Sequence, residues 1–215
     1  MKNWFFLPAL LLLLVPGHQL LPQSITIPTS DGRPVLTDGL LEIEEWGDAF
    51  RFEIGQTAIV LVKEHRGHVF VGIDCGELGK PFSMDLFLSA PGAGIHQLHA
   101  SAQLGERVLG REEDEDPMWV WGNASGWYAN EVRWNQPMAE SLVAEGLTRD
   151  EAQRRALFPY EGFEFQVKRS KVPGDEWLMR FEIRSSPDYD APLVYPSGTA
   201  GRDTQGWLRA SFEGR

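Results

Sequence analysis

The sequence predicts an all-β protein, an antiparallel β-sandwich with one short α-helical insertion. Two observations carry this prediction. Short runs of alternating apolar and polar residues recur along the chain, with Gly, Pro, Asn and Asp clustered between them. Only between residues 137 and 158 does the pattern change to that of a helix. Alternation puts one face of each strand in a core, so a series of such strands is expected to form two packed sheets.

The N-terminus has the pattern of a secretory signal peptide. Lys2 supplies a positive start, and residues 7–15 form an apolar run. That run is shorter than the ~20 residues of a membrane-spanning helix. We therefore expect residues 1–24 to be the signal, cleaved between about residues 17 and 24. Residues 25–215 would then be one mature domain, secreted or periplasmic and without a membrane span; an uncleaved anchor is the alternative.

The charge balance limits the classes of partner. The formal net charge is −11, and 24% of the residues are charged. Nucleic acids and anionic lipid surfaces both require a basic face, so this balance argues against either partner. Cys75 is the only cysteine, which rules out a disulfide within the chain. It lies on the apolar face of its run, where a buried small side chain is the expected role.

The predicted strands follow a short arm rich in Pro, Asp, Thr and Gly. Residues 57–65 are almost continuously apolar, which is typical of a central strand. Arg66 and Gly67 separate this run from residues 68–75, so we expect a hairpin with a two-residue loop. Further alternating runs, each expected to form one strand, occupy residues 83–90, 94–105, 160–170, 176–186 and 206–214.

The helical insertion carries a capping signal. Thr148 precedes the apolar pattern, and Glu151 follows three residues later, which together form a capping box. Arg154 and Arg155 lie in the later turn, where the helix dipole favours positive charge. Residues 137–146 are expected to add a second short helix before it.

Metal binding receives little support. His65 and His68 flank the hairpin loop as a cross-strand pair, expected to be solvent-exposed, but no third ligand lies nearby in the sequence. His96 and His99 are an odd number of positions apart, so a strand points them to opposite faces. The acidic run 111–117 is most simply a solvated loop, with a calcium site as the lesser alternative. We therefore expect no metal site.

Catalytic signals are also weak. The sequence contains no nucleophile elbow, no phosphate-binding loop and no dinucleotide fingerprint. Pairs of carboxylates are plentiful, but an acidic chain produces them by chance, and none stands out as a glycosidase pair. A non-enzymatic protein is the expectation.

The tryptophans provide the candidate ligand site. Trp177 lies on the apolar face of its run and Trp46 ends an amphipathic turn, so both are expected in the core. Trp207 lies opposite its apolar neighbours, and Trp127 lies in a loop rich in Gly and Asn. If they are exposed, indoles of this kind can stack on the C–H face of a sugar; a structural role is the equal alternative for both. The candidate ligand-binding residues are Trp207, Arg209, Trp127, Trp121, Asn123 and Asn130.

The other tryptophans have a simpler expected role. Trp119 and Trp121 are two residues apart, so one strand face carries both, and Trp134 lies between loop and helix signals. We expect all three to pack beneath the loops of the sandwich.

Several short motifs occur in the order of a known group. The opening has an Asp-Gly pair, an apolar residue, an acidic residue, a Glu-Trp pair and a small residue. Three expected strands follow it in order: "HVFVGI" with an aromatic residue, "MDLFLS" with an Asp near its start, and "WLMRFEI". The matched single residues are Asp38, Gly39, Leu40, Glu42, Glu45, Trp46, Ala49, Phe70, Pro196, Asp203 and Trp207. In this order the chain resembles the carbohydrate-binding family 9 / DOMON-like β-sandwich group. It departs from the group in its Gly-Trp order at 206–207 and in its helical insertion.

The resemblance implies a role for the opening stretch and for the ligand. Trp46 is expected to dock the first element on the core, with Glu45 accepting backbone hydrogen bonds and the other acidic residues facing water. Binding members of the group clamp a sugar between two indoles. Trp207 matches one of them by position, with Trp121 or Trp127 as its partner. The implied function is that of a secreted, non-catalytic carbohydrate-binding domain.

Two alternatives remain from other classes. One is an envelope or extracellular interaction module without a small ligand, in which the helical insertion and the acidic surface meet a protein partner. The other is a haem-binding redox domain, since some DOMON relatives hold haem between a Met and a His on facing strands. Met84, Met179, His68 and His96 are the residues available for it.

Overall fold

The computed structural model describes residues 24–54, 58–76, 81–110, 117–122, 125–185 and 192–214. Residues 1–23 of the expected signal peptide, residues 111–116 of the acidic run and Asn123 lie outside this part of the chain. No helix in the described ranges combines the length and the apolar content that crossing a bilayer requires.

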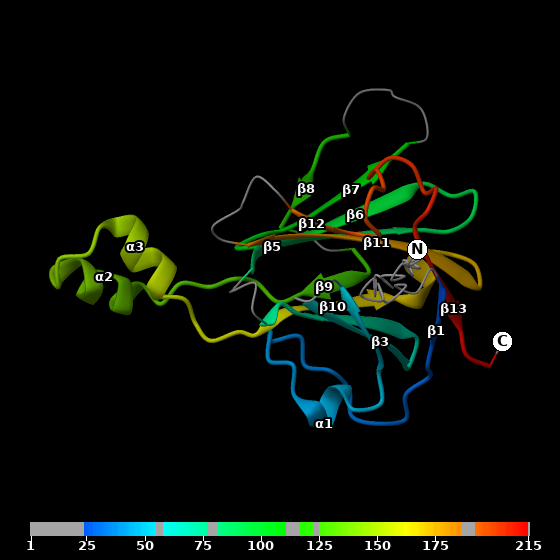
Figure 1. Cartoon of the computed structure of the whole chain (residues 1–215), viewed down its shortest axis with the longest axis horizontal. Helices are drawn as coiled ribbons and strands as arrows, with labels where there is room; N and C mark the ends of the chain where they lie inside the picture. The colour runs from blue at the N-terminus through cyan, green and yellow to red at the C-terminus, as the bar shows by residue number, and fades with distance from the viewer. Residues whose placement is uncertain are drawn as a thin grey trace, which may run out of the picture.

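Two β-sheets packed face to face form the body of the molecule, which confirms the predicted β-sandwich (Figure 1). In the larger sheet only the β1–β13 pair is parallel, and β12 pairs with β11 beside the main path. Its strands, in spatial order, are β1 (Ser24–Ile27), β13 (Leu208–Phe212), β11 (Glu176–Ser185), β5 (Pro81–Ser89), β6 (Ile95–Ala100), β7 (Leu104–Leu109) and β8 (Val120–Trp121), with β12 (Leu193–Tyr195). The smaller sheet runs β2 (Phe50–Ile54), β3 (Ala58–His65), β4 (His68–Asp74), β10 (Gly162–Lys168) and β9 (Trp127–Ala129).

The core lies between the sheets and follows the predicted alternation. The inward side chains of β5 and β11 are buried, and they meet those of β10 and β4 from the other sheet. Trp177 is fully buried, as expected. Cys75 is buried too, and burial raises the pKa of its thiol to about 12. The opposite residues of each strand therefore face outward, and on the larger sheet this outer face carries the site described below.

The first hairpin forms as predicted. Arg66 and Gly67 both have positive φ, 49° and 77°, which a two-residue turn between β3 and β4 requires. His65 lies opposite His68, but the expectation that both are exposed is wrong for His65. Its Nδ1 lies 2.9 Å from the carbonyl oxygen of Ser30, because the arm after β1 covers this end of the strand.

The expected single strand over residues 94–105 is divided. β6 ends at Ala100 and β7 begins at Leu104, and the two pair as an antiparallel hairpin. Ser101 and Gln103 close the turn: the backbone N–H of each donates to an oxygen of the other, at 3.1 and 3.2 Å. Alternation continued through the turn by coincidence, since Ala102 keeps the period but lies in no strand.

The opening stretch crosses the outer side of the smaller sheet through α1 (Ile43–Trp46; Figure 1). Trp46 is buried, as expected, and its Nε1 donates to the carboxylate of Glu164 at 2.8 Å. The same carboxylate accepts the backbone N–H groups of Gly39 (2.8 Å) and Asp38 (3.0 Å). Glu45 accepts the N–H of Leu36 at 3.1 Å, which confirms its predicted role. The opening stretch is therefore fixed to the smaller sheet by these hydrogen bonds, and its role is structural.

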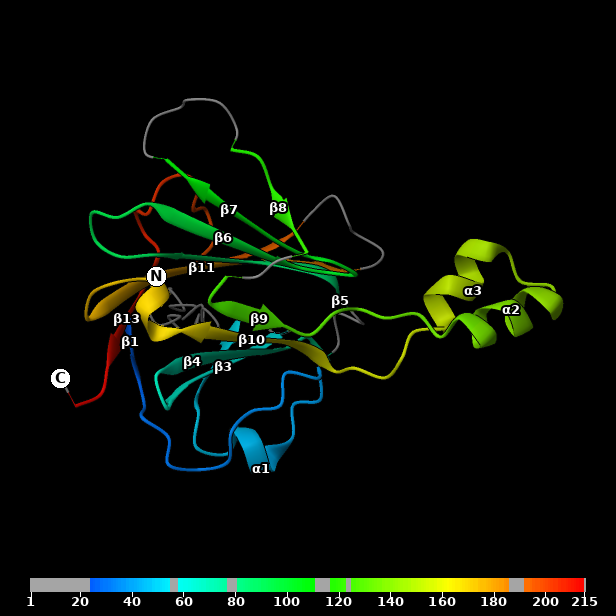
Figure 2. The same cartoon turned by 180° about the vertical axis from the view of Figure 1, so that it is seen from behind.

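The helical insertion projects away from the sandwich as a two-helix arm (Figures 1 and 2). It consists of α2 (Gln136–Ala144) and α3 (Arg149–Arg155). The predicted capping box is present: Glu151 N–H donates to Thr148 Oγ1 at 3.3 Å, and Thr148 N–H donates to the Glu151 carboxylate at 3.0 Å. A 3-10 turn, η2 (Arg169–Lys171), follows β10.

Candidate functional site

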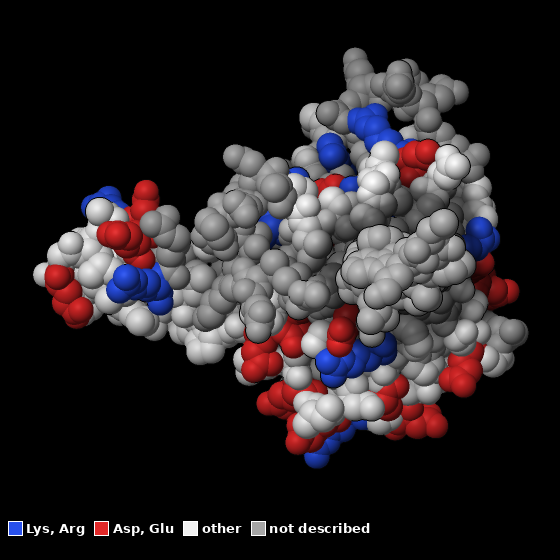
Figure 3. Space-filling view, in the orientation of Figure 1, with Lys and Arg blue, Asp and Glu red and all other residues white. Residues whose placement is uncertain are grey.

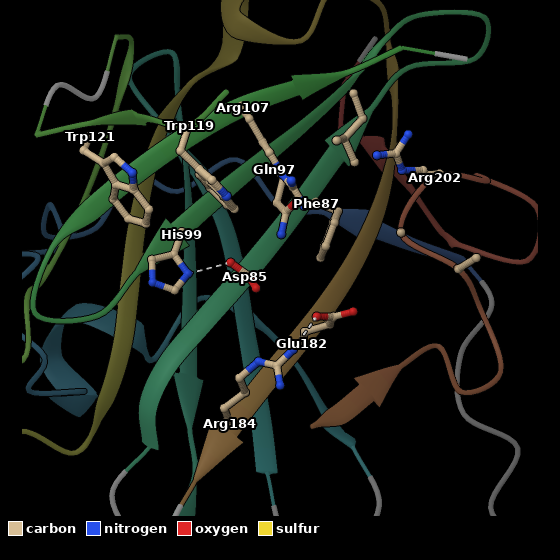
Figure 4. Close-up of a pocket in the computed structure, with 13 residues that line it drawn as sticks. Asp85, Phe87, Gln97, His99, Arg107, Trp119, Trp121, Glu182, Arg184 and Arg202 are labelled. Atoms are coloured by element: carbon tan, nitrogen blue, oxygen red, sulfur yellow. Dashed lines mark hydrogen bonds and ion pairs between the residues drawn. The ribbon is translucent and has the colours of Figure 1, made fainter. Parts of the chain in front are cut away.

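An open groove of about 630 Å³ lies on the outer face of the larger sheet, on the side away from the core (Figure 4). Outward side chains of β11, β5, β6 and β7 form its floor. The segment around β8 forms one wall, and residues 200–202 lie at the other side. The groove is thus built from segments that lie far apart in the sequence, and the strand register decides which side chains meet in it.

One row of residues runs straight across the floor. Glu182 of β11 lies opposite Asp85 of β5, Asp85 opposite His99 of β6, and His99 opposite Gly105 of β7. Gly105 in turn lies opposite Trp121 of β8. Directly opposed residues on one sheet face have Cβ atoms about 5 Å apart, so this row forms a continuous polar strip that ends at an indole.

His99 and Asp85 form a close pair within this row. His99 Nδ1 lies 2.7 Å from Asp85 Oδ1. An ionised carboxylate can only accept, so Nδ1 is the donor, and a neutral imidazole keeps Nε2 as its acceptor. The imidazole also stands edge-on to the rings of Trp119 and Trp121, at centroid distances of 5.7 and 5.6 Å. The pair therefore links the polar floor to the aromatic wall.

The aromatic wall is a stack of three planar groups. The Trp119 and Trp121 rings are 5.2 Å apart and 26° from parallel, and the Arg107 guanidinium lies 4.6 Å from the Trp119 centroid. Trp119 lies between the other two (Figure 4). A Cβ at Gly105 would approach the Trp121 ring to 2.6 Å, so glycine is what lets this indole lie on the strand. Trp121 remains 49% exposed and is the more open of the two indoles that line the groove.

A second row of outward side chains runs beside the first. Arg180 lies opposite Phe87, Phe87 opposite Gln97, and Gln97 opposite Arg107. Arg107 Nε donates to Gln97 Oε1 at 2.7 Å, and the Arg180 guanidinium lies 4.7 Å from the Phe87 ring centroid. Burial, and then the nearby positive charge of Arg202, lower the pKa of Arg107, against the opposing effect of the groove carboxylates. Amide, guanidinium and aromatic groups thus converge on one open surface.

Trp207 does not face solvent, so its expected role as an exposed sugar-stacking indole is wrong and the structural alternative holds. It is only 3% exposed, and its Nε1 donates to the carbonyl oxygen of Ala200 at 3.1 Å. Its ring meets Phe87 edge-to-face at 5.9 Å within a small apolar cluster outside the main core. Trp207 lies on the side of its strand away from the main core, as alternation predicts, but the chain before β13 folds over that side and covers the indole.

Trp127 and Asn130 also have structural contacts. Trp127 is buried, stacks on Phe165 at 6.0 Å and 16°, and donates from Nε1 to the Glu106 carboxylate at 2.9 Å. Asn130 is buried beside β10, where its Oδ1 accepts the N–H of Glu164 at 2.7 Å. Neither residue lines the groove. The loop pattern that marked them as accessible is in fact β9 and its flank.

Of the other predicted site residues, one lines the groove, one lies outside it and one is not described. Arg209 is exposed but pairs with Glu176 of the neighbouring strand at 2.6 Å, outside the groove. Asn123 lies outside the described residues. Trp121 lines the groove, and it is the one predicted residue that the structure brings there among those it describes. Its expected burial under the loops is wrong, as is that of Trp134, which is 41% exposed; Trp119 is half-buried.

The sequence did not predict most of the side chains that line the groove. Those not predicted are Asp85, Phe87, Gln97, His99, Arg107, Glu182, Arg184 and Arg202. A signal for some of them existed, because alternation places Asp85, His99 and Glu182 on the outer, largely polar faces of their strands. Their convergence depended on the order β11-β5-β6-β7, which the sequence does not specify.

The metal and haem candidates are not brought together. Within the described ranges, no group of three or more His, Cys, Asp and Glu side chains is arranged to hold a metal ion. Met84 and Met179 are buried in the core, whereas His68 is half-buried at the hairpin end. His96 Nδ1 lies 3.2 Å from the Glu106 carboxylate.

Fold and site together define a two-sheet β-sandwich with an aromatic and polar groove on the outer face of its larger sheet. No family model matches the sequence, and no curated protein matches it. The solved structures to which the chain is similar include two with carbohydrate-binding names. One is a carbohydrate binding module family 9 domain from Caldicellulosiruptor kristjanssonii in complex with cellotriose, with 12% identity, a TM-score of 0.46, and 89% of this chain and 94% of that chain covered. The other is a putative carbohydrate-binding protein from Bacteroides uniformis, with 10% identity, a TM-score of 0.44, and coverage of 88% and 99%.

Proposed function

We propose that this protein is a secreted, non-catalytic carbohydrate-binding domain that holds a saccharide in the groove, stacked on Trp121. One observation carries the proposal: an indole that is 49% exposed stands beside hydrogen-bonding groups from three neighbouring strands. Residues 1–24 would serve as the signal peptide that exports the chain. N-terminal sequencing of the exported protein tests that part, with a new terminus between about residues 17 and 25 as the expected result.

The chemistry of the groove suits a sugar. A pyranose has an apolar C–H face that packs on an indole, and hydroxyl groups around its rim that need both donors and acceptors. Beside Trp121 the groove offers the acceptor Asp85, the donors of Arg107, and the mixed groups of Gln97 and His99. A volume of about 630 Å³ is within the range of ligand pockets, and the open shape admits a longer chain.

The two groove carboxylates support a binding role rather than hydrolysis. Glycoside hydrolysis needs one carboxylic acid to donate a proton and a second carboxylate to attack or to activate water. Here Asp85 is held by His99 at 2.7 Å, and Glu182 is held by Arg180 at 2.6 Å. Both groove carboxylates thus already have partners in the floor, which supports a role in positioning and binding.

Isothermal titration with neutral and acidic oligosaccharides tests the proposal. We expect binding to at least one of them, weakened by about tenfold or more in Trp121→Ala, because loss of a central aromatic anchor commonly costs above ~1.4 kcal/mol. Trp134→Ala is the matched control, since Trp134 is also exposed but lies outside the groove. The proposal fails if no saccharide binds, or if Trp121→Ala binds as the parent does.

A second candidate function rests on the two-helix arm. The arm and its base expose four large apolar side chains, and the arm projects clear of the sandwich (Figure 2). They are Trp134 (41%), Met138 (44%), Val143 (40%) and Phe158 (50%). Exposed apolar groups in one region are typical of protein contacts. A pull-down from the source organism that depends on Met138 and Val143, but not on Trp121, would favour an interaction module over sugar binding.

A further inference from the structure

A second hollow, of about 260 Å³, lies at one corner of the smaller sheet. It is formed by β4, β10, β9 and the turn before β9. The residues that line it are His68, Gly126, Trp127, Tyr128, Gln166 and Lys168. None of them lines the groove on the larger sheet, so the hollow is a separate place on the molecule.

Strand register decides which side chains meet at this hollow. Gln166 of β10 lies opposite Tyr128 of β9, and Lys168 of β10 lies opposite His68 of β4. The residues of β10 that alternate with Gln166 and Lys168 are buried in the core between the sheets. These polar side chains therefore project from the outer face of the smaller sheet, on the opposite side of the sandwich from the groove.

Gly126 keeps the hollow open. The backbone N–H of Lys168 donates to the carbonyl oxygen of Gly126 at 2.8 Å, so Gly126 continues the pairing of β9 with β10. Its φ is 76°, in the left-handed region that favours glycine. A Cβ there would lie 3.8 Å from Cδ of Lys168, in van der Waals contact. A larger residue at this position would therefore fill part of the hollow.

The opening stretch covers a neighbouring part of the same face. Trp46 packs with Phe70, and a Cβ on Gly72 would lie 2.8 Å from the Trp46 ring. Tyr128 lies two strands away from Phe70 and is 41% exposed. Among the described residues, the covering thus ends before β9, and the Tyr128 ring is accessible to a ligand.

The polar groups around the hollow are available for binding. Within the part of the chain that the structure describes, the Tyr128 hydroxyl, the Gln166 amide and the Lys168 ammonium make no hydrogen bond or ion pair. Together they supply both donors and acceptors, which sugar hydroxyl groups need. An exposed aromatic ring beside an amide, a cation and an imidazole is also the combination that the groove presents at Trp121.

The two exposed rings belong to strands that follow one another in the chain. Trp121 lies in β8, the last strand of the larger sheet, and Tyr128 lies in β9, the last strand of the smaller sheet (Figure 1). The chain passes from one sheet to the other between them. Because the rings belong to opposite outer faces, one sugar ring cannot contact both.

The surroundings of the hollow favour a neutral ligand. The whole chain carries a formal net charge of −11. Figure 3 shows Asp and Glu side chains gathered over the lower part of the sandwich, where Figure 1 places the smaller sheet. Negative charge raises the cost of bringing an anion to this side of the molecule, whereas uncharged hydroxyl groups do not meet that cost.

We propose that this hollow is a second saccharide-binding site, in which a neutral sugar ring packs on Tyr128 and hydrogen-bonds to Gln166 and Lys168. This inference rests on the proposed carbohydrate binding and adds a separate site to it. One domain then holds two saccharide chains, one on each outer face of the sandwich.

Equilibrium dialysis of the mature chain with labelled cellotetraose, xylotetraose and mannotetraose tests the inference. We expect the parent to bind about two molecules of at least one probe per chain at saturation. Trp121→Ala weakens the groove and leaves the second site to be measured. Tyr128→Ala added to that variant should weaken the second site by about tenfold or more, because the aromatic anchor is lost.

Two further variants assign the effect to the Tyr128 ring. Tyr128→Phe should keep more of the affinity than Tyr128→Ala, since it retains the ring. Phe158→Ala is the control, because Phe158 is 50% exposed and lines neither site, and it should leave both affinities unchanged. Binding of about one probe per chain, or an unchanged affinity in Tyr128→Ala, overturns the inference and leaves carbohydrate binding intact. Binding of no saccharide, neutral or acidic, overturns both.

Discussion

The buried carboxylate of Glu164 makes the stability of this protein depend on pH in the neutral range. Glu164 is completely buried and fastens the opening stretch to the smaller sheet through Trp46, Gly39 and Asp38. Burial raises the pKa of Glu164 from 4.5 to about 7, and the neighbouring Asp38 charge adds to this, while the N–H donors oppose it. The folded chain therefore binds this proton more tightly than the unfolded chain does.

The sign and size of the effect follow from the two pKa values. Below about pH 4.5 the group is protonated in both states, and its favourable contribution to stability is fully present. As the pH rises through about 7, the folded state must hold a buried charge, and the contribution is lost. A change in pKa from 4.5 to about 7, at about 1.36 kcal/mol for each pKa unit, corresponds to about 3 kcal/mol.

Urea unfolding of the parent and of Glu164→Gln between about pH 5 and about pH 8 measures this. We expect the parent to lose about 2.5 kcal/mol more than the variant across that range, most of the full effect, because Gln stays neutral and retains an acceptor oxygen. Asp48 and Glu106 have lowered pKa values, so their contributions fall off only at lower pH and cancel in the comparison. Parallel pH profiles for the two proteins would refute the reasoning.

The remaining predictions concern packing and the groove. Trp207→Ala should destabilise the fold by about 3–5 kcal/mol in urea unfolding, as truncation of a buried aromatic does; a loss below about 1 kcal/mol would contradict its buried place. Asp48→Asn should cost about 3 kcal/mol in the same assay, because it leaves the fully buried Lys63 ammonium with backbone carbonyl partners but without a counter-charge. A loss below about 1 kcal/mol would show that the half-exposed Asp48 contributes no more than a surface ion pair does. Gly105→Ala should displace the Trp121 ring and weaken saccharide binding with little change in melting temperature. Unchanged affinity in calorimetry would show that Trp121 is not part of the binding site.

The local elements were predictable because they depend on residues close together in sequence. Arg66 and Gly67 form the hairpin turn, and Thr148 with Glu151 forms the capping box, each through contacts over at most three residues. The core side of each strand followed from alternation, which placed Trp177 and Cys75 correctly. The division of residues 94–105 was missed because the turn happened to preserve the same period.

The candidate site was mostly not predictable, and Trp207 and Trp121 show why. Alternation tells which side of a sheet a residue occupies, but it does not tell whether another segment covers that side. Trp207 is covered by the chain that precedes β13, whereas Trp121, expected to be buried, stands open on the short β8. Coverage depends on the paths of segments that only the complete fold brings together.

The sequence by itself determined that this chain forms a β-sandwich with a helical arm, because period-two alternation and turn residues act locally. Only the tertiary structure decided that Glu182, Asp85, His99 and Gly105 form one row leading to Trp121. Strand order and register join residues almost one hundred positions apart, and they are set by the packing of the whole core. The groove exists because that packing leaves these outward side chains together and uncovered.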